Sequence, residues 1–290
     1  NMFYKLPIIL AFICYSLVLQ SQDDVIQKQK VYKTIDGNPL TVDIFSTTET
    51  ASHEGNPAIA FFHGGGWAFG EPSEFHNACR RYAQKGFVTF SFAYRLSITK
   101  NGTVPHPEIT PVESVKDARG ALRWLKENYH KLNIDPEKII AAGQSAGGQL
   151  ALSTALCKNI NESTDNLNTD PTPVALLIYS GTVNAVEAWA DRLLGDRRDE
   201  IWSMSPFHNL HSGMPPVIHF HSKDDPVVPF WSVEYFMFET RKLGNHFDLI
   251  RYEDRKHYLG EGNDHYSEYF DEEILERTDK FLETFGLMPN

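Results

Sequence analysis

Positive charge is scarce in this chain of 290 residues. Lysine and arginine together number 27 against 38 aspartates and glutamates, which gives a formal net charge of −11 at pH 7. An acidic protein is repelled by nucleic acid and by anionic membrane surfaces, so neither is expected as a partner. A neutral or polymeric substrate is compatible with this charge.

Cysteine is also scarce, with three residues in the chain, and Cys14 lies in an apolar N-terminal stretch. Cys79 and Cys157 fall at core-like positions of predicted helices, so we expect two free, buried thiols rather than a disulfide. Neither cysteine has the spacing of a metal site, and no suitably spaced carboxylate pair supplies one. We therefore expect no metal and no other cofactor.

The N-terminus has the pattern of a secretory signal peptide over residues 1–22, with Lys5 followed by a mostly apolar stretch from Leu6 to Leu19. This stretch is too short for a comfortable membrane span, so no stable membrane anchor is expected. An uncleaved anchor is the alternative. Cleavage near Ser21 or Gln22 predicts a secreted or periplasmic protein, and the absence of repeats and linkers predicts a single domain over residues 23–290.

The pattern of apolar residues predicts an α/β fold. Val31–Asp36 and Leu40–Phe45 alternate apolar and polar residues, which predicts an antiparallel hairpin at a sheet edge. From residue 58 onward strands and helices alternate, which predicts a mostly parallel central sheet with helices on both faces.

The remaining elements follow from apolar runs, helical periodicity and proline or glycine breaks. Strands are expected at Ala58–Phe62, Phe87–Ala93, the run before Gly143, Val174–Tyr179, Val217–His221 and Phe247–Tyr252. Helices are expected at Ser73–Lys85, Val112–Tyr129, Phe230–Leu243 and Ser267–Phe285, a loop at Leu96–Pro111 and a turn at Asn133–Pro136. Residues 181–215 form an insertion that is expected to hold a pair of short helices near the site and is too short for a cap domain.

The pentapeptide Gly143-Gln144-Ser145-Ala146-Gly147 lies between a short apolar run and a helix-like segment. The pattern G-x-S-x-G in this context holds a serine on a sharp turn between strand and helix, with its hydroxyl exposed. Glycine neighbours let the strand and the helix approach closely. Ser145 is therefore the candidate nucleophile, and a helix cap or a phosphate-binding residue is the alternative.

A serine nucleophile needs a base, a group that orients the base and donors for the developing oxyanion. The segment His63-Gly64-Gly65-Gly66-Trp67 follows an apolar strand, and glycines there leave backbone N–H groups open to a substrate carbonyl. Together with the N–H of Ala146, these groups are the expected oxyanion donors. His63 itself is expected to brace the loop by hydrogen bonds.

The acid and the base are expected after later strands. Asp225 follows the strand at Val217, and we favour it over Asp224 because Pro226 fixes its turn. His257 follows the strand Phe247–Tyr252, whereas His246 precedes that strand and His265 lies farther along the chain. The alternatives are a turn aspartate and a surface histidine. His219 and His221 are expected to be packed strand residues.

The combination of HGGGW at 63–67, GQSAGG at 143–148, DPVVP at 225–229 and His257 resembles the α/β-hydrolase superfamily. Within it, the chain is similar to bacterial acetyl esterases and lipases of the hormone-sensitive-lipase type, and to carbohydrate esterases that remove acetyl or feruloyl groups from plant polysaccharides. The resemblance implies a triad of Ser145, Asp225 and His257, with Gly65, Gly66 and Ala146 as oxyanion donors.

Two features differ from the lipase-type pattern. Gln144 stands where those enzymes usually carry an acidic residue, and no long helical cap precedes the HGGGW segment. The resemblance therefore implies an open site that suits an ester on a bulky carrier. Trp67 and Gln144 are the weaker candidates for contact with the substrate.

We therefore expect a secreted serine carboxylesterase that acts on acetyl or hydroxycinnamoyl esters, on a plant or algal polysaccharide. One alternative is a general short-chain acetyl esterase or lipase that acts on small esters. More distant alternatives are a peptidase of the prolyl-oligopeptidase type and a hydrolase-fold binding protein without activity. The sequence carries no signal for an oligomeric state.

Overall fold

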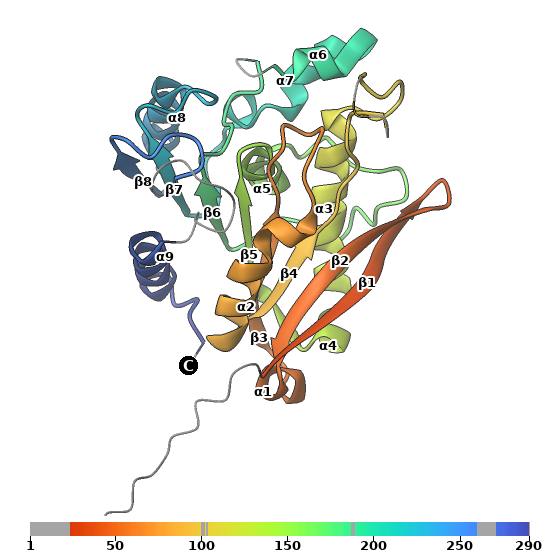
Figure 1. Cartoon of the computed structure of the whole chain (residues 1–290), viewed down its shortest axis with the longest axis vertical. Coiled ribbons are helices and arrows are strands. Elements are labelled where there is room, and N and C mark those ends of the chain that lie inside the picture. The colour runs from red at the N-terminus through yellow and green to blue at the C-terminus, as the bar shows by residue number, and fades with distance from the viewer. Residues whose placement is uncertain (1–23, 100–101, 103, 187–188, 260–270, 290) are drawn as a thin grey trace, which may run out of the picture.

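A single sheet organises the computed structural model, which describes residues 24–99, 102, 104–186, 189–259 and 271–289. Within these residues eight strands lie in the order β1-β2-β4-β3-β5-β6-β7-β8 (Figure 1). β1 (Val25–Ile35) pairs antiparallel with β2 (Asn38–Thr47), and β2 pairs antiparallel with β4 (Val88–Phe92). The predicted edge hairpin is confirmed, and both of its strands are longer than predicted.

All other strand pairs in the described part of the chain are parallel, as predicted. The strands are β3 (Asn56–Phe62), β4, β5 (Ile134–Gln144), β6 (Ala175–Tyr179), β7 (Val217–Ser222) and β8 (Phe247–Tyr252). Because parallel strands end at the same edge, the loops that follow β3, β5, β7 and β8 lie on one side of the molecule.

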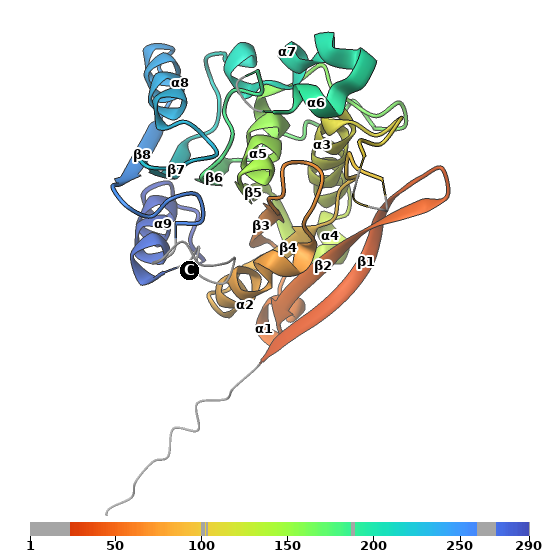
Figure 2. The same cartoon turned by 45° about the horizontal axis from the view of Figure 1, so that its top comes forward.

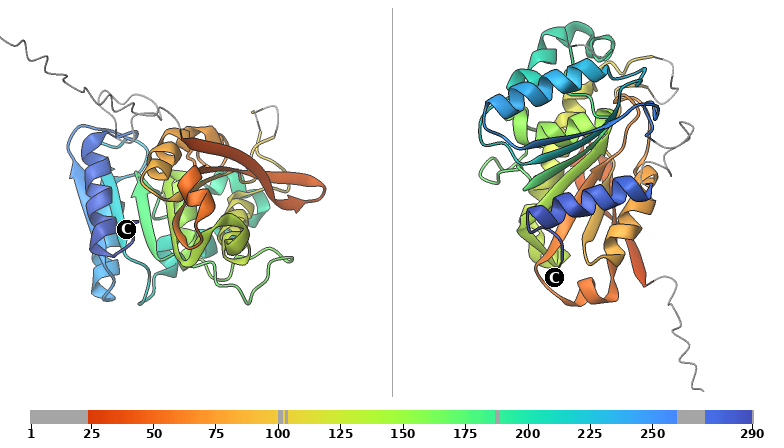
Figure 3. Two further views of the ribbon diagram at one scale, coloured as in Figure 1. Left: turned by 90° about the horizontal axis from the view of Figure 1, so that it is seen from below. Right: turned by 90° about the vertical axis from the view of Figure 1, so that its left-hand side faces the viewer.

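Helices cover both faces of the sheet (Figure 3). α2 (His76–Gln84) and α9 (Glu272–Thr284) pack on one face, and α3 (Pro111–Glu127), α5 (Ala146–Leu156) and α8 (Phe230–Lys242) pack on the other. β3 shows why two cores form, because successive side chains of a strand point to opposite faces. Ala58, Ala60 and Phe62 join one core, whereas Ile59 and Phe61 join the other.

Short helices complete the described chain. They are α1 (Thr48–Ser52), α4 (Tyr129–Leu132), α6 (Asp191–Leu194) and α7 (Ile201–Met204), with 3-10 turns at Pro72–Phe75, Gly195–Glu200 and Pro206–Asn209. α6 and α7 belong to the insertion between β6 and β7, and Figure 2 shows them beyond the ends of α3 and α5. The insertion thus contains short helices, as predicted.

Several boundaries differ from the prediction. Ile134–Pro136 were expected in a turn but open β5, because Ile134 pairs with Asn56 of β3. Of the predicted turn Asn133–Pro136, only Asn133 lies outside β5. It has a left-handed φ of 56°, a conformation that asparagine tolerates. The helix expected at Val112–Tyr129 is interrupted at Asn128, so that α3 and α4 are separate.

The closing helix begins at Glu272, where the Asp271 side chain caps the amide of Ile274. The first four residues of the helix predicted at Ser267–Phe285 lie outside the described residues. The predicted signal peptide and His265 lie outside the described residues. Among the helices that the structure describes, none is long and apolar enough to cross a membrane.

A buried ion cluster ties the edge hairpin to α3. Asp117 of α3 is fully buried, and its carboxylate accepts hydrogen bonds from the backbone and the guanidinium of Arg95 at 2.7–2.9 Å. Lys33 of β1 places its Nζ 3.3 Å from Asp117 Oδ1, and Glu162 lies 2.7 Å from the Arg95 guanidinium. Each charge in this cluster is desolvated, so each depends on its partners.

Replacing Asp117 tests the importance of this cluster for stability. Asp117→Ala is expected to lower the free energy of unfolding by about 3–5 kcal/mol, because Lys33 and Arg95, whose side chains are only 10% and 12% exposed, would lose their shared partner. Denaturant titration measures the change. The control is Glu54→Ala, since the Glu54 side chain is 75% exposed and its pair with His130 spans 3.8 Å. Equal losses of stability in the two variants would contradict the account.

Candidate active site

Ser145 lies at the sharp turn between β5 and α5, with φ 53° and ψ −119°. Positive φ is uncommon outside glycine and persists only where the surroundings determine it. Here the Ser145 amide donates to the Tyr179 carbonyl at 3.0 Å, and the Ser145 carbonyl accepts from the amides of Gln149 and Thr182, both at 3.1 Å. The backbone of Ser145 is therefore held from both sides.

The glycines beside Ser145 are required by close backbone contacts. A Cβ atom on Gly143 would collide with the backbone of Gly147, and one on Gly147 would collide with the carbonyl oxygens of Phe62 and His63. These contacts join the turn to the end of β3, from which the HGGGW segment leaves. The steric role that the sequence predicted for these glycines is confirmed.

The structure brings together the three side chains that the sequence selected. His257 Nε2 lies 3.0 Å from Ser145 Oγ, and His257 Nδ1 lies 2.8 Å from Asp225 Oδ2. Ser145 follows β5, Asp225 follows β7 and His257 follows β8, and each side chain is at most 9% exposed. This is the geometry of a nucleophile, a base and an orienting acid.

The loop after β7 presents Asp225 in one orientation. Its Oδ1 accepts hydrogen bonds from the amides of Val227 and Val228 at 2.8 and 3.0 Å, which directs Oδ2 to His257. Asp224 is exposed, and its carboxylate accepts from the Ser222 hydroxyl and the Lys256 amide. The geometry therefore distinguishes the two aspartates as the sequence did.

His221 supports the same loop, and the sequence did not reveal this contact. Its ring is fully buried, with Nε2 3.0 Å from the Val228 carbonyl oxygen and 3.5 Å from Asp225 Oδ2. Burial lowers the pKa of His221 although Asp225 acts to raise it. Its neighbour His219 accepts a hydrogen bond at Nε2 from the Gly181 amide. The signal in the sequence that could have revealed this contact is a histidine near the end of β7, four residues before Asp225.

The HGGGW segment (63–67) turns back over the end of β3. Gly65 and Gly66 have φ values of 103° and 59°, and the Gly65 carbonyl accepts from the amides of Ala68 and Phe69 at 3.1 and 2.9 Å. A Cβ atom on Gly64 would collide with the Gln144 side chain, so the segment packs directly against the serine turn. Ala146 is the first residue of α5, where an N–H has no partner within the helix.

The side chains of His63 and Tyr94 hold the start of the HGGGW segment by hydrogen bonds. His63 Nδ1 donates to the Gly64 carbonyl at 2.8 Å, and the Tyr94 hydroxyl donates to the carbonyls of His63 and Gly64 at 2.8 and 3.1 Å. The two rings stack with centroids 4.2 Å apart. Burial lowers the pKa of His63 to about 4, and burial raises the pKa of the nearby Glu74 to about 7. His63 is therefore neutral at pH 7 and braces the loop.

Trp67 and Gln144, the two weaker candidates for contact with the substrate, are both buried. Trp67 is 1% exposed and its indole donates to Gln149 Oε1 at 2.9 Å, which favours packing over substrate contact. Gln144 is also buried, with Nε2 3.3 Å from His257 Nε2. Trp189 of the insertion is 39% exposed, and its ring would collide with a Cβ atom on Gly66. The insertion thus reaches the HGGGW segment.

The described residues contain neither a metal-binding cluster nor an activated thiol. No group of three or more histidine, cysteine, aspartate or glutamate side chains there is placed to hold a metal ion. Cys79 and Cys157 are free and buried, as predicted. Burial raises the pKa of the Cys157 thiol to about 12 and raises that of Cys79 as well, so neither thiol is activated.

A mostly parallel sheet with a serine on the turn after β5, an acid after β7 and a histidine after β8 defines an α/β-hydrolase. The chain belongs to the BD-FAE family, whose model matches residues 42–237. The resemblance to esterases and lipases that the motifs indicated is confirmed by the relatives below.

Esterase 2 of Thermogutta terrifontis is similar in structure, with a TM-score of 0.79 and 29% identity, and the match covers 91% of this chain and 96% of that one. Lipase 2 of Moraxella sp. strain TA144 is 27% identical over 67% of this chain and 50% of its own length. Carboxylesterase NlhH of Mycobacterium tuberculosis is 33% identical over 33% of this chain and 27% of its own. The chain thus matches half or less of the length of these two curated relatives.

The buried histidines make the stability of the fold sensitive to acid. Burial lowers the pKa of His63, His219 and His221, so the unfolded chain binds their protons at a higher pH than the folded chain does. Their contribution to stability is fully present above about pH 6.5 and is lost as the pH falls toward the folded pKa values. Denaturant titration at about pH 7.5 and about pH 5 is expected to show lower stability at the acidic pH.

Two variants separate the contributing groups. His63→Gln is expected to reduce the fall in the free energy of unfolding between the two pH values, because it removes one histidine with a lowered pKa. Glu74→Gln is expected to increase this fall, because the raised pKa of Glu74 stabilises the fold on acidification. The exposed His53→Gln is the control and should leave the slope unchanged. A stability that stays constant or rises between the two pH values would contradict the account.

Proposed function

We propose that this protein is a serine carboxylesterase that forms an acyl-enzyme on Ser145. The observation that carries the proposal is the chain of contacts from Ser145 Oγ through the His257 ring to Asp225, at 3.0 and 2.8 Å. The relatives named as esterase, lipase and carboxylesterase support ester hydrolysis over peptide hydrolysis or binding alone.

The reaction begins when Ser145 Oγ attacks the ester carbonyl and His257 Nε2 takes its proton. Asp225, through its bond to Nδ1, holds the ring in the required tautomer and stabilises the imidazolium. The negative charge on the carbonyl oxygen is stabilised by backbone N–H groups of Gly65, Gly66 and Ala146. His257 then gives its proton to the departing alcohol, and a water molecule activated by the same ring hydrolyses the acyl-enzyme.

The proposed substrate is an acetyl or hydroxycinnamoyl ester on a polysaccharide outside the cell. The insertion between β6 and β7, whose described residues form only short helices, supports a bulky carrier, and the net charge of −11 supports a neutral one. Structures of the Thermogutta esterase 2 with propionate and with butyrate support a short acyl group. The N-terminal sequence supports secretion or export to the periplasm.

A general esterase or lipase that acts on small esters is the second candidate. The names of the Moraxella and Mycobacterium relatives favour it, because neither name refers to a carbohydrate. The two candidates differ in the carrier and share the chemistry at Ser145.

A substrate panel distinguishes these candidates. We expect release of acetate or ferulate from acylated xylan and hydrolysis of 4-nitrophenyl acetate, with little activity on medium-chain lipid esters. Ser145→Ala is expected to lower kcat on every substrate by about 10⁴-fold or more, because the nucleophile is lost. The exposed Ser163→Ala is the matched control. Activity confined to medium-chain esters would contradict the proposed substrate, and full activity of Ser145→Ala would contradict the mechanism.

A further inference from the structure

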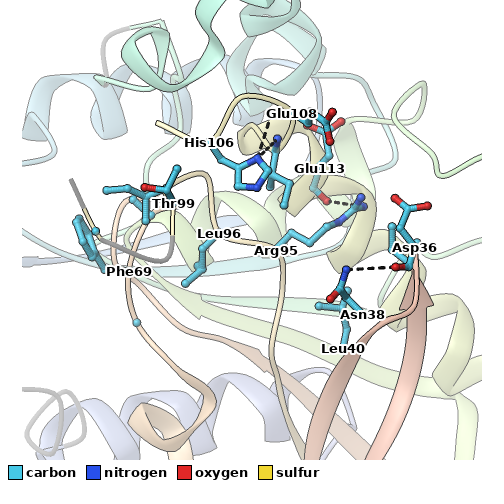
Figure 4. Close-up of a pocket in the computed structure, with 16 residues that line it drawn as sticks. Asp36, Asn38, Leu40, Phe69, Arg95, Leu96, Thr99, His106, Glu108 and Glu113 are labelled. Atoms are coloured by element: carbon cyan, nitrogen blue, oxygen red, sulfur yellow. Dashed lines mark hydrogen bonds between the residues drawn. The ribbon is translucent and has the colours of Figure 1, made fainter. Parts of the chain in front are cut away.

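We propose that a cavity beside the HGGGW segment binds neutral sugar residues of the ester's carrier, an inference that rests on the proposed esterase function. The cavity has a volume of about 910 Å³ and none of the three triad side chains lines it. This volume lies within the range of cavities that bind small organic ligands. Figure 4 shows it between the tip of the β1–β2 hairpin and the loop that follows β4.

The cavity shares a wall with the proposed oxyanion loop. Ala68, Phe69 and Gly70 line the cavity, and the amides of Ala68 and Phe69 donate to the Gly65 carbonyl at 3.1 and 2.9 Å. The same turn therefore shapes the HGGGW segment on one side and the cavity on the other. A carrier held in the cavity would therefore contact the same turn that shapes the proposed oxyanion loop.

One side of the cavity is apolar and includes an exposed aromatic ring. Leu40, Leu96, Ile98 and Ile109 contribute partly buried aliphatic side chains. Phe69 is 52% exposed, and Figure 4 shows its ring at the edge of the lining residues, away from Asp36 and Asn38. The C–H face of a sugar ring is apolar and carries partial positive charge, so it packs on the electron-rich face of an aromatic ring.

The other lining groups suit hydroxyls. His106 Nδ1 accepts hydrogen bonds from the amides of Glu108 and Ile109 at 3.1 and 3.0 Å, so Nε2 is the nitrogen left to donate. Asn38 donates from Nδ2 to the Asp36 carbonyl, and its Oδ1 is an acceptor. The cavity thus combines donors with acceptors, and a hydroxyl both donates and accepts. A lipid chain would bury these polar groups without partners, which is unfavourable.

The charges of the cavity favour a neutral ligand. The Arg95 guanidinium is already paired with Asp117 and Glu162, each at 2.7 Å. Asp36 and Glu108 are exposed carboxylates with no ion pair among the described residues. The described lining therefore offers an anionic carrier no unpaired cation, and the two rim carboxylates repel it.

Phe69→Ala tests the stacking surface through two substrates. With an acetylated neutral xylo-oligosaccharide, KM is expected to rise about tenfold with kcat nearly unchanged, because the ring contributes binding and no chemistry. With 4-nitrophenyl acetate, which has no sugar, kcat/KM should stay within about twofold. Phe238→Ala is the matched control, since Phe238 is 59% exposed on α8 and lies outside the cavity. Equal losses on both substrates would overturn the proposal.

His106→Asn tests the polar side. The asparagine Oδ1 can still accept the two backbone hydrogen bonds, whereas the Nε2 donor is lost. We expect a higher KM for the oligosaccharide, again with 4-nitrophenyl acetate unaffected. An unchanged KM for the oligosaccharide in both Phe69→Ala and His106→Asn would overturn the proposal.

Calorimetry on the Ser145→Ala protein separates sugar binding from catalysis. An unesterified neutral xylo-oligosaccharide is expected to bind this protein, to bind about tenfold more weakly after Phe69→Ala is added, and to bind more tightly than a glucuronate-bearing oligosaccharide. No binding, or stronger binding of the anionic sugar, would overturn the proposal. Absence of esterase activity in the unmodified protein would instead contradict the proposed function.

Discussion

The strained backbone of Ser145 is the constraint on which the rest of the site depends. A serine with φ 53° is unfavourable in isolation and is held here by hydrogen bonds from Gln149 and Thr182 and to Tyr179. Because a side chain on Gly143 or Gly147 would collide with neighbouring backbone, the turn requires glycine two residues before and two residues after the serine. The turn therefore places the hydroxyl and the start of α5 at the same point of the sheet edge.

Support for the other groups comes from buried polar residues that are neutral at pH 7. His221 holds the loop that carries Asp225, and His63 with Tyr94 holds the HGGGW segment. Burial lowers the pKa of both histidines, so neither introduces a positive charge close to the triad at that pH. The arrangement leaves His257 as the ring that contacts both the serine and the aspartate. A site so built is sensitive to acid through its supports.

Much of this arrangement could be predicted from the sequence because steric necessity leaves a local signature. The glycines around Ser145 and after His63 mark backbone that approaches other backbone, and the apolar runs mark strands buried on both faces. Asp225 could be chosen over Asp224 because a proline follows it. These signals are short-range and need no knowledge of the partner segment.

Contacts between distant segments had no such signature. Ile134–Pro136 looked like a turn because of the proline, but pairing of Ile134 with Asn56 extends β5 through them. The cluster of Lys33, Arg95, Asp117 and Glu162 joins four separate parts of the chain, and no local pattern relates them. The cavity beside Phe69 likewise forms where the tip of the β1–β2 hairpin meets the loop after β4, which is roughly sixty residues farther along the chain.

Covalent labelling tests the central claim, that the turn and the His257–Asp225 pair make Ser145 a nucleophile. Treating the protein with a fluorophosphonate probe and mapping the label by peptide mass spectrometry is expected to place it on Ser145. The rate is expected to fall in Asp225→Asn on the order of 10³–10⁴-fold, because the histidine would lose the carboxylate that orients it. No label, a label on another residue, or undiminished labelling of Asp225→Asn would contradict the account.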